Sequence, residues 1–274
     1  MTGNTEHALD ARHLAGCLAL SRAANWNQNE ADWRLMLELG QGWGISAADG
    51  TLVASTLVLP YGAFAWISMV LVLPAQRRKG YASRLLRTAT AELERRGQLP
   101  VLDATPAGRE VYRGQGFRDT WGFKRFRLDG PAPAQGAGAA RPVEHWESLL
   151  ALDAEAFGGS RERLLRALQA RMPRAALELS GRGFVLARDG REASQIGPLV
   201  ARDEAAAIAL LGAALHAVGP PLYVDAADHA PRLQEWLLAQ GFVVQRPFTR
   251  MVRGAARAPG NERRVYLVAG PELG

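Results

Sequence analysis

The chain has 274 residues, a length that allows one large domain or two ordinary domains, each able to bury a core. Its formal net charge is +6, but its arginines are scattered among acids without a dense basic tract, so the charge is weak evidence for a nucleic-acid partner. The single cysteine, Cys17, excludes an intrachain disulfide framework. No apolar run approaches the length of a membrane span, and the polar first ten residues lack a signal-peptide pattern. We therefore expect a soluble, cytoplasmic protein with no membrane partner.

Two helices are expected between about Asp10 and Leu39, joined by a turn at Asn25–Gln28. Asn29 suits the N-cap of the second helix, and capping alone is one explanation of this turn. Loops on rigid scaffolds also often carry binding groups. Trp26 and Gln28 in the turn, with Trp33 on the helix, are therefore candidate substrate-binding residues.

The glycine-rich run at Gly40–Gly44 resembles a phosphate loop, but it precedes a strand instead of following one, so we reject that interpretation. Asp49-Gly50 predicts a hairpin turn between strands at 44–47 and 51–54, and 56–59 would continue the second strand. Ile67–Leu73 is rich in apolar residues and is bounded by Pro74, as expected for a buried strand.

A basic, glycine-containing loop links this strand to a helix that is expected to end near Gly97. Arg77, Arg78 and Lys79 crowd the positive end of the helix dipole, which is unfavourable unless an anion binds there. The first N–H groups of the helix can bind a phosphate, and Gly80 with the small Ala82 allows close approach. The alternative is a solvated basic turn that binds nothing.

The first half ends with a strand at Pro100–Ala104, a helix that begins near Pro106 and carries Tyr112, and a half-buried strand at Phe123–Leu128. Residues 130–141 form a Pro/Ala/Gly-rich segment that we interpret as an interdomain linker. Beyond it the same order of helices and strands returns. Phe248–Arg253 repeats Phe123–Leu128 at a shift of about 124 to 125 residues, which indicates a tandem duplication. The predicted domains are 1–129 and 142–274.

Two motifs stand at a suitable distance from each other in the first half. Val72-x-Pro74 precedes Arg77-x-x-Gly80-x-Ala82, and Tyr112-x-x-x-Gly116-Phe117 follows downstream. With these motifs the chain resembles the GNAT superfamily of acyl-CoA-dependent N-acyltransferases, and as a whole it resembles bacterial tandem-GNAT proteins with a degenerate C-terminal domain. The resemblance implies an α/β (α+β) fold of two tandem GNAT-like domains. Each domain would have a mixed, mostly antiparallel, splayed sheet flanked by helices, with acetyl-CoA in the splay of the first.

The resemblance also implies roles for individual residues. The thioester carbonyl would accept a backbone N–H near Val72, the pyrophosphate would bind amides from Arg78 to Ser83, and Tyr112 would protonate the departing thiolate. The alternative for Tyr112 is a core aromatic with its hydroxyl at the surface. The expected cofactor-binding residues are Leu71, Val72, Leu73, Arg77, Arg78, Lys79, Gly80, Tyr81, Ala82 and Ser83.

A general base is harder to assign. Asp103 ends a strand beside the expected cleft and is a candidate, and a turn or cap carboxylate before Pro106 is an equally good explanation of it. The histidines show no metal-ligand spacing, so no metal is expected.

The second copy departs from the first at both motifs. Asp203 and Glu204 replace the basic loop and suit a self-capped helix that would repel phosphate. Leu237 stands five residues before Phe242, where the first copy has Tyr112 before Phe117. We therefore expect that the C-terminal domain does not bind CoA catalytically, and that it completes the sheet or shapes an acceptor pocket at the interface.

The sequence thus predicts an acetyl-CoA-dependent N-acetyltransferase that acts on the primary amine of a small-molecule or amino-acid-like acceptor. A protein or peptide N-acyltransferase and a CoA-binding regulatory module without turnover are the alternatives. The oligomeric state is not predicted.

Overall fold

The computed structural model describes residues 4–131 and 139–274. The first half contains β1 (Thr5–Leu9), α1 (Leu14–Ala23), α2 (Glu30–Leu39), β2 (Gln41–Ser46), β3 (Leu52–Pro60), β4 (Phe64–Val72), α3 (Tyr81–Arg95), β5 (Leu99–Ala104), α4 (Pro106–Arg113) and β6 (Arg118–Leu128). The second half contains β7 (Arg141–Pro142), α5 (Trp146–Phe157), α6 (Glu162–Arg171), β8 (Leu177–Leu179), β9 (Gly183–Arg188), β10 (Ser194–Ala201), α7 (Glu204–Ala217), β11 (Leu222–Ala227), α8 (Pro231–Ala239), β12 (Val243–Val252) and β13 (Val265–Leu267). The order from α1 to β6 recurs from α5 to β12, which confirms the duplication.

Within the described residues, thirteen strands form one continuous sheet in the order β1-β2-β3-β4-β5-β12-β6-β11-β13-β10-β9-β8-β7. Its pairings are antiparallel except β4 with β5 and β10 with β11. The mixed, mostly antiparallel sheet is therefore as predicted. The short strands β1, β7, β8 and β13 were not predicted.

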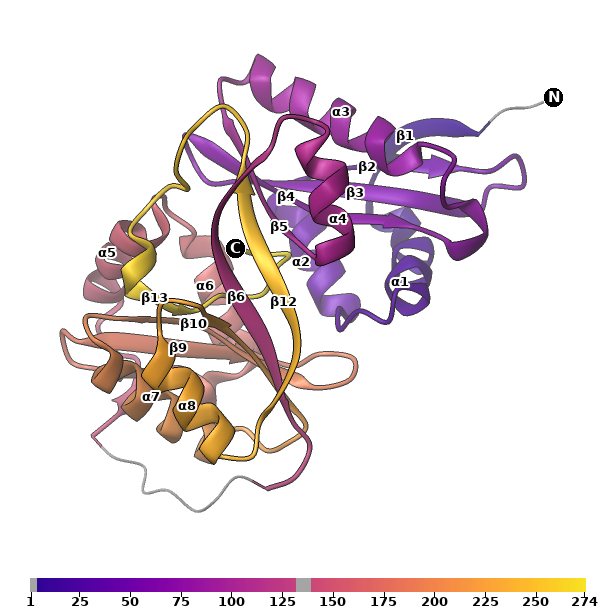
Figure 1. The fold of residues 1–274 in the computed structure, drawn as a ribbon. Helices are drawn as coiled ribbons and strands as arrows, with labels where there is room; N and C mark the ends of the chain where they lie inside the picture. Colours follow the sequence, from indigo (N-terminus) through magenta and orange to yellow (C-terminus); the bar gives the residue numbers. More distant parts are fainter. Residues whose placement is uncertain (1–3, 132–138) are drawn as a thin grey trace.

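The last strand of each repeat, β6 in the first and β12 in the second, is exchanged between the halves. β12 pairs with β5 of the first half, and β6 pairs with β11 of the second, so the two long strands run side by side where the halves meet (Figure 1). At their centre Phe123 lies opposite Phe248, with stacked rings 5.0 Å apart. These two residues occupy matching positions of the repeat, so an approximate two-fold axis passes between them. The domain boundaries at 129 and 142 stay a prediction, and each half of the sheet is completed by the other half's strand.

Two buried ion pairs fasten the exchanged strands. Asp103 of β5 binds Arg250 of β12 at 2.9 Å, and Asp225 of β11 binds Arg125 of β6 at 2.7 Å. The four side chains are at most 5% exposed. The pairs are equivalent under the two-fold relation of the repeat. Removing one partner of such a pair typically costs about 3–5 kcal/mol, because the other charge is left buried.

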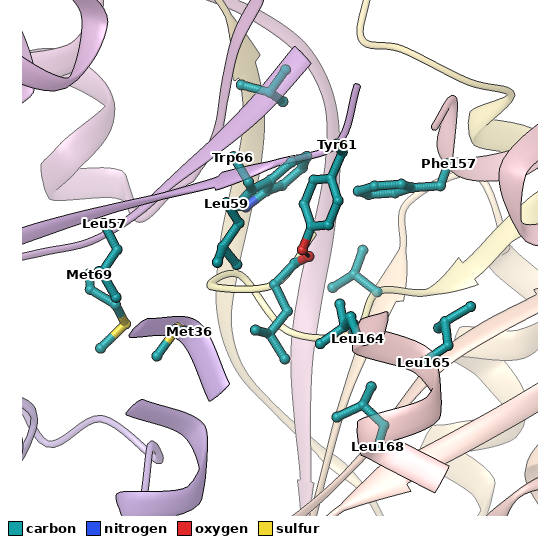
Figure 2. Close-up of a cluster of buried hydrophobic side chains, with 14 of the residues drawn as sticks. Met36, Leu57, Leu59, Tyr61, Trp66, Met69, Phe157, Leu164, Leu165 and Leu168 are labelled. Atoms are coloured by element: carbon teal, nitrogen blue, oxygen red, sulfur yellow. Dashed lines mark hydrogen bonds between the residues drawn. The ribbon is translucent and has the colours of Figure 1, made fainter. Parts of the chain in front are cut away.

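Helices cover both faces of the sheet. On one face, α2 contacts α6, and a single hydrophobic cluster joins Met36, Trp66, Phe157 and Leu168 from the two halves (Figure 2). On the other face of the first half, α3 packs against Ile67, the neighbour of Trp66 in β4, because alternate residues of a strand point to opposite faces. The shared cluster makes the halves one packed unit.

The segment after β13 returns to the first half. The Trp66 indole donates to the carbonyl of Pro271 at 3.0 Å, and the Tyr61 hydroxyl donates to that of Leu273 at 2.9 Å. Figure 2 shows Tyr61 between Trp66 and Phe157. This C-terminal segment (268–274) therefore bridges the two halves.

Of the predicted linker at 130–141, residues 132–138 lie outside the described residues. No helix among the described residues is long and apolar enough to cross a membrane.

Candidate active site

The sheet opens between β4 and β5. The two strands pair only from Phe64 and Leu99 to Trp66 and Val101, whereas β4 continues to pair with β3 as far as Val72. A register shift between β3 and β4 accompanies a positive φ of 50° at Met69, as expected for a bulge that bends the strand. Buried backbone groups require partners, so the edge of β4 beyond Trp66 can hydrogen-bond a ligand. The predicted splay is present.

The loop before α3 has the features of an anion site. Arg78 and Gly80 are left-handed, with φ of 63° and 80°, and no side chain caps the first amides of α3. In the described part of the chain, Arg77, Arg78 and Lys79 form no ion pair with a carboxylate. A Cβ at Gly80 would meet no atom within 4 Å, so space is open in front of the helix. Free amides, open space and unpaired cations together fit a phosphate group.

A narrow cavity of about 40 Å³ lies beside the open stretch of β4. The segment from Ile67 to Val70 forms one wall. Trp26 and Gln28 also line it, and Gln28 is only 4% exposed. Trp33 lies elsewhere: it is fully buried in the core, where its indole donates to the Ser21 hydroxyl at 2.9 Å. We therefore leave Trp33 out of the candidate site.

Tyr112 reaches this cavity from α4. Its ring packs near Phe117, with 6.1 Å between centroids, so the spacing of the downstream motif reflects a direct contact. Burial raises the pKa of the Tyr112 hydroxyl to about 12. The group is therefore protonated at neutral pH and is able to donate a proton into the cavity.

Asp103 also lines the cavity, and both of its carboxylate oxygens accept hydrogen bonds from Arg250 at 2.9 and 3.0 Å. Burial raises the pKa of Asp103, and the Arg250 guanidinium opposes that shift. Asp225 makes the equivalent pair with Arg125 in the other half. The ion pair with Arg250 is a structural explanation for a buried aspartate at this position. The role of Asp103 as a general base stays a prediction.

The second half supplies cavity residues that the sequence did not suggest. Arg246 and Phe248 come from β12, and Glu272 comes from the C-terminal segment. Arg125, from β6, is a further lining residue. The expectation that the second half completes the sheet is confirmed by β12. These residues could not be predicted as part of the site, because nothing local in the sequence says whether β12 pairs with β5 or with β11.

The corresponding opening in the second half is filled by the chain itself. β10 and β11 pair in parallel from Ser194 to Ile196, and beyond this point β13 lies between them, with Leu267 pairing to both strands. In front of α7, Asp203 accepts a hydrogen bond from the Ala206 amide at 2.8 Å and forms an ion pair with Arg182 at 2.9 Å. This helix end is self-capped, as predicted.

Comparison with known proteins agrees with this geometry. The model of the Acetyltransferase (GNAT) family matches residues 12–117, and that of an Acetyltransferase (GNAT) domain matches residues 149–267. The chain therefore belongs to the GNAT superfamily as a tandem-domain acyltransferase.

No group of His, Cys, Asp and Glu that could hold a metal ion occurs among the described residues.

Individual relatives are distant but extend over most of the chain. An uncharacterized N-acetyltransferase of Bacillus subtilis, YitH, is 22% identical over 85% of this chain and 86% of its own length. A putative acetyltransferase from Pyrococcus horikoshii has a TM-score of 0.85 at 21% identity, covering 100% of this chain and 97% of that one. A tandem GNAT protein from the clavulanic acid biosynthesis pathway has a TM-score of 0.62 at 16% identity, covering 91% and 98%. The solved structures share the fold.

Proposed function

We propose that the protein is an acetyl-CoA-dependent N-acetyltransferase that transfers the acetyl group to the primary amine of a small-molecule or amino-acid-like acceptor by direct attack on the thioester. The observation that carries the proposal is the continuity of three features. An uncapped helix end with unpaired cations, an open β4 edge and a cavity containing a protonated tyrosine follow one another along the splay. The cytoplasm remains the proposed location.

The donor would be held by the first half. Its phosphates fit the amides from Arg78 to Ser83 with the cations of the loop, and its pantetheine arm fits the edge at Leu71, Val72 and Leu73. When bound, acetyl-CoA supplies an acyl carbon activated as a thioester. A free backbone N–H of the splayed strand is a preorganised donor of the kind that stabilises charge on the thioester oxygen.

The acceptor would occupy the cavity. An alkylamine is mostly protonated at neutral pH, with a reference pKa of about 10.4, so it must lose a proton before it attacks. Asp103 remains the proposed base, on condition that its bonds to Arg250 loosen. Tyr112 holds a proton beside the splay and would give it to the leaving sulfur. The narrow cavity favours a small acceptor over a peptide.

A screen of amines with acetyl-CoA, followed by release of free thiol, tests the proposal. We expect turnover with small primary amines and a rise in the melting temperature of the protein with acetyl-CoA alone. Peptides with free N-termini belong in the same screen, because preferential turnover of peptides would favour the alternative acceptor class. Thermal stabilisation by acetyl-CoA without turnover of any amine would instead favour a binding module.

A further inference from the structure

Four charged side chains line the cavity, and three of them are neutralised by partners inside the protein. Asp103 pairs with Arg250, Arg125 with Asp225, and Glu272 with Arg188. Arg246 differs from them. Among the described residues it has no carboxylate partner, and its Nε is buried without any hydrogen-bond partner.

The surroundings of Arg246 make an external anion the missing partner. Its guanidinium lies over the Phe248 ring at 5.2 Å, an aromatic surface that orients the group and supplies no full negative charge. Burial and the nearby Arg125 lower the pKa of Arg246, and the more distant charges of Asp225 and Glu272 oppose that shift without pairing with the guanidinium. Only the Nε end of this half-buried side chain is enclosed, and a small carboxylate that enters the cavity can accept a bidentate pair of hydrogen bonds from the guanidinium.

Two neutral groups of the cavity also lack partners. Gln28 is 4% exposed and Ser68 is 6% exposed, and neither Gln28 Oε1 nor Ser68 Oγ has a hydrogen-bond partner in the described structure. Both oxygens can accept hydrogen bonds from an amine. Unsatisfied buried polar atoms are rare in native proteins, so three of them lining one cavity indicate a ligand with one anionic end and one N–H donor end.

We propose that the acceptor is a small amino-carboxylate, an α-amino acid or close analogue, whose carboxylate pairs with Arg246 and whose amine faces Gln28 and Ser68. The inference rests on the proposed function and narrows its acceptor class. In the transfer, the amine nitrogen bonds to the acetyl carbon, the carbon–sulfur bond breaks, and the sulfur takes the Tyr112 proton. The ammonium form gives up two protons, one of which restores Tyr112, so one proton is released to solvent.

Matched acceptors test the role of the carboxylate. For the full-length protein with acetyl-CoA, thiol release is measured with an amino acid small enough for the narrow cavity, its carboxamide and its decarboxylated amine, for example alanine, alaninamide and ethylamine. We expect kcat/KM for the acid to exceed both others by at least about tenfold, which corresponds to about 1.4 kcal/mol. Arg246→Gln is expected to abolish this preference, and Arg246→Lys to retain part of it. Arg232→Gln, at an exposed arginine of α8, is the matched control and should change nothing.

A binding measurement separates this inference from the proposed function. Calorimetric titration of the amino acid into the protein saturated with CoA should show binding that Arg246→Gln weakens by about tenfold, while the melting shift caused by acetyl-CoA is retained. Equal turnover of acid, carboxamide and amine, or a preference that survives in Arg246→Gln, would overturn the inference and leave the acetyltransferase proposal standing. Absence of both the acetyl-CoA melting shift and any acetylated amine would overturn both.

Discussion

The two halves of the molecule share one architecture and differ at the place where their sheets open. Between β4 and β5 the opening is free, and the helix that faces it starts with unpaired cations and uncapped amides. Between β10 and β11 the opening holds β13, and the helix in front of it is capped by Asp203. The fold therefore requires neither the basic loop nor the free opening. Their presence in the first half alone is the reason for proposing that half as the one that binds the donor.

The filled half nevertheless contributes to the open one. β12 joins β5 and brings Arg246 and Phe248 to the cavity, and the segment that follows β13 brings Glu272. A duplicated domain that no longer has an open cleft can thus supply the walls of its neighbour's site. Substitutions in the two halves therefore test how much of the chemistry resides in the first half.

The largest effect is expected at Tyr112. Tyr112→Phe removes the proposed proton donor and should lower kcat by about 10²–10⁴-fold with little change in acetyl-CoA binding. The matched control is Tyr266→Phe, in the strand that fills the second opening, which should leave kcat unchanged. Retention of full turnover by Tyr112→Phe would remove Tyr112 from the mechanism.

The dependence of kcat on pH in the unaltered protein is a second test of Tyr112 as the proton donor. Because the pKa of Tyr112 is raised to about 12, the hydroxyl stays protonated from neutral pH up to that value. Deprotonation of Tyr112 would abolish its ability to donate, so its contribution to kcat is lost only as pH rises through about 12. A falling limb of kcat near pH 8 that disappears in Tyr112→Phe would contradict this assignment.

The next largest effect is expected at the helix end in the first half. Gly80→Glu places a like charge where phosphate would bind and strains a residue with φ of 80°, so it should abolish the acetyl-CoA melting shift and lower turnover by about 100-fold. Gly50→Glu introduces the same side chain at a glycine with φ of 84° in another open site. This variant should keep both the acetyl-CoA melting shift and the turnover. Loss of the melting shift in both variants would mean that Gly80→Glu acts through strain alone.

The sequence predicted much of this contrast, because its signals are local. The basic loop at Arg77–Gly80, the capping Asp203 and the replacement of Tyr112 by Leu237 can each be read within a few residues of the chain. Strand exchange could not be read in this way, because β12 and β6 would satisfy the same hydrogen bonds beside either β5 or β11. The side chains Arg246 and Glu272 reach the cavity only through that exchange and through the C-terminal segment, so their role depends on tertiary structure. The sequence around Trp33 allows its side chain to face either the core or a pocket, and in the structure the side chain packs in the core.

A moderate effect on stability is expected at the paired aspartates. Asp103→Asn and Asp225→Asn each leave a buried arginine unpaired, so each should lower the free energy of unfolding by about 3–5 kcal/mol, measured by urea denaturation. Because the pairs are equivalent, the Asp225 variant is the control for the structural part of the Asp103 effect. If Asp103 is also the base, only Asp103→Asn should lower kcat in the fraction that remains folded. Equal kcat values in the two variants would assign Asp103 to structure alone.

The smallest effect is expected at the capped helix of the second half. Asp203→Ala removes the cap of α7 and its ion pair with the exposed Arg182, and should lower the free energy of unfolding by about 1 kcal/mol. It should alter neither turnover nor the affinity for acetyl-CoA, because β13 still fills the opening behind that helix. Calorimetric titration of acetyl-CoA into the variant measures this directly. A second binding event, or a change in affinity as large as that caused by Gly80→Glu, would show that the second half takes part in donor binding. The two openings would then differ in affinity for the donor and not in the ability to bind it.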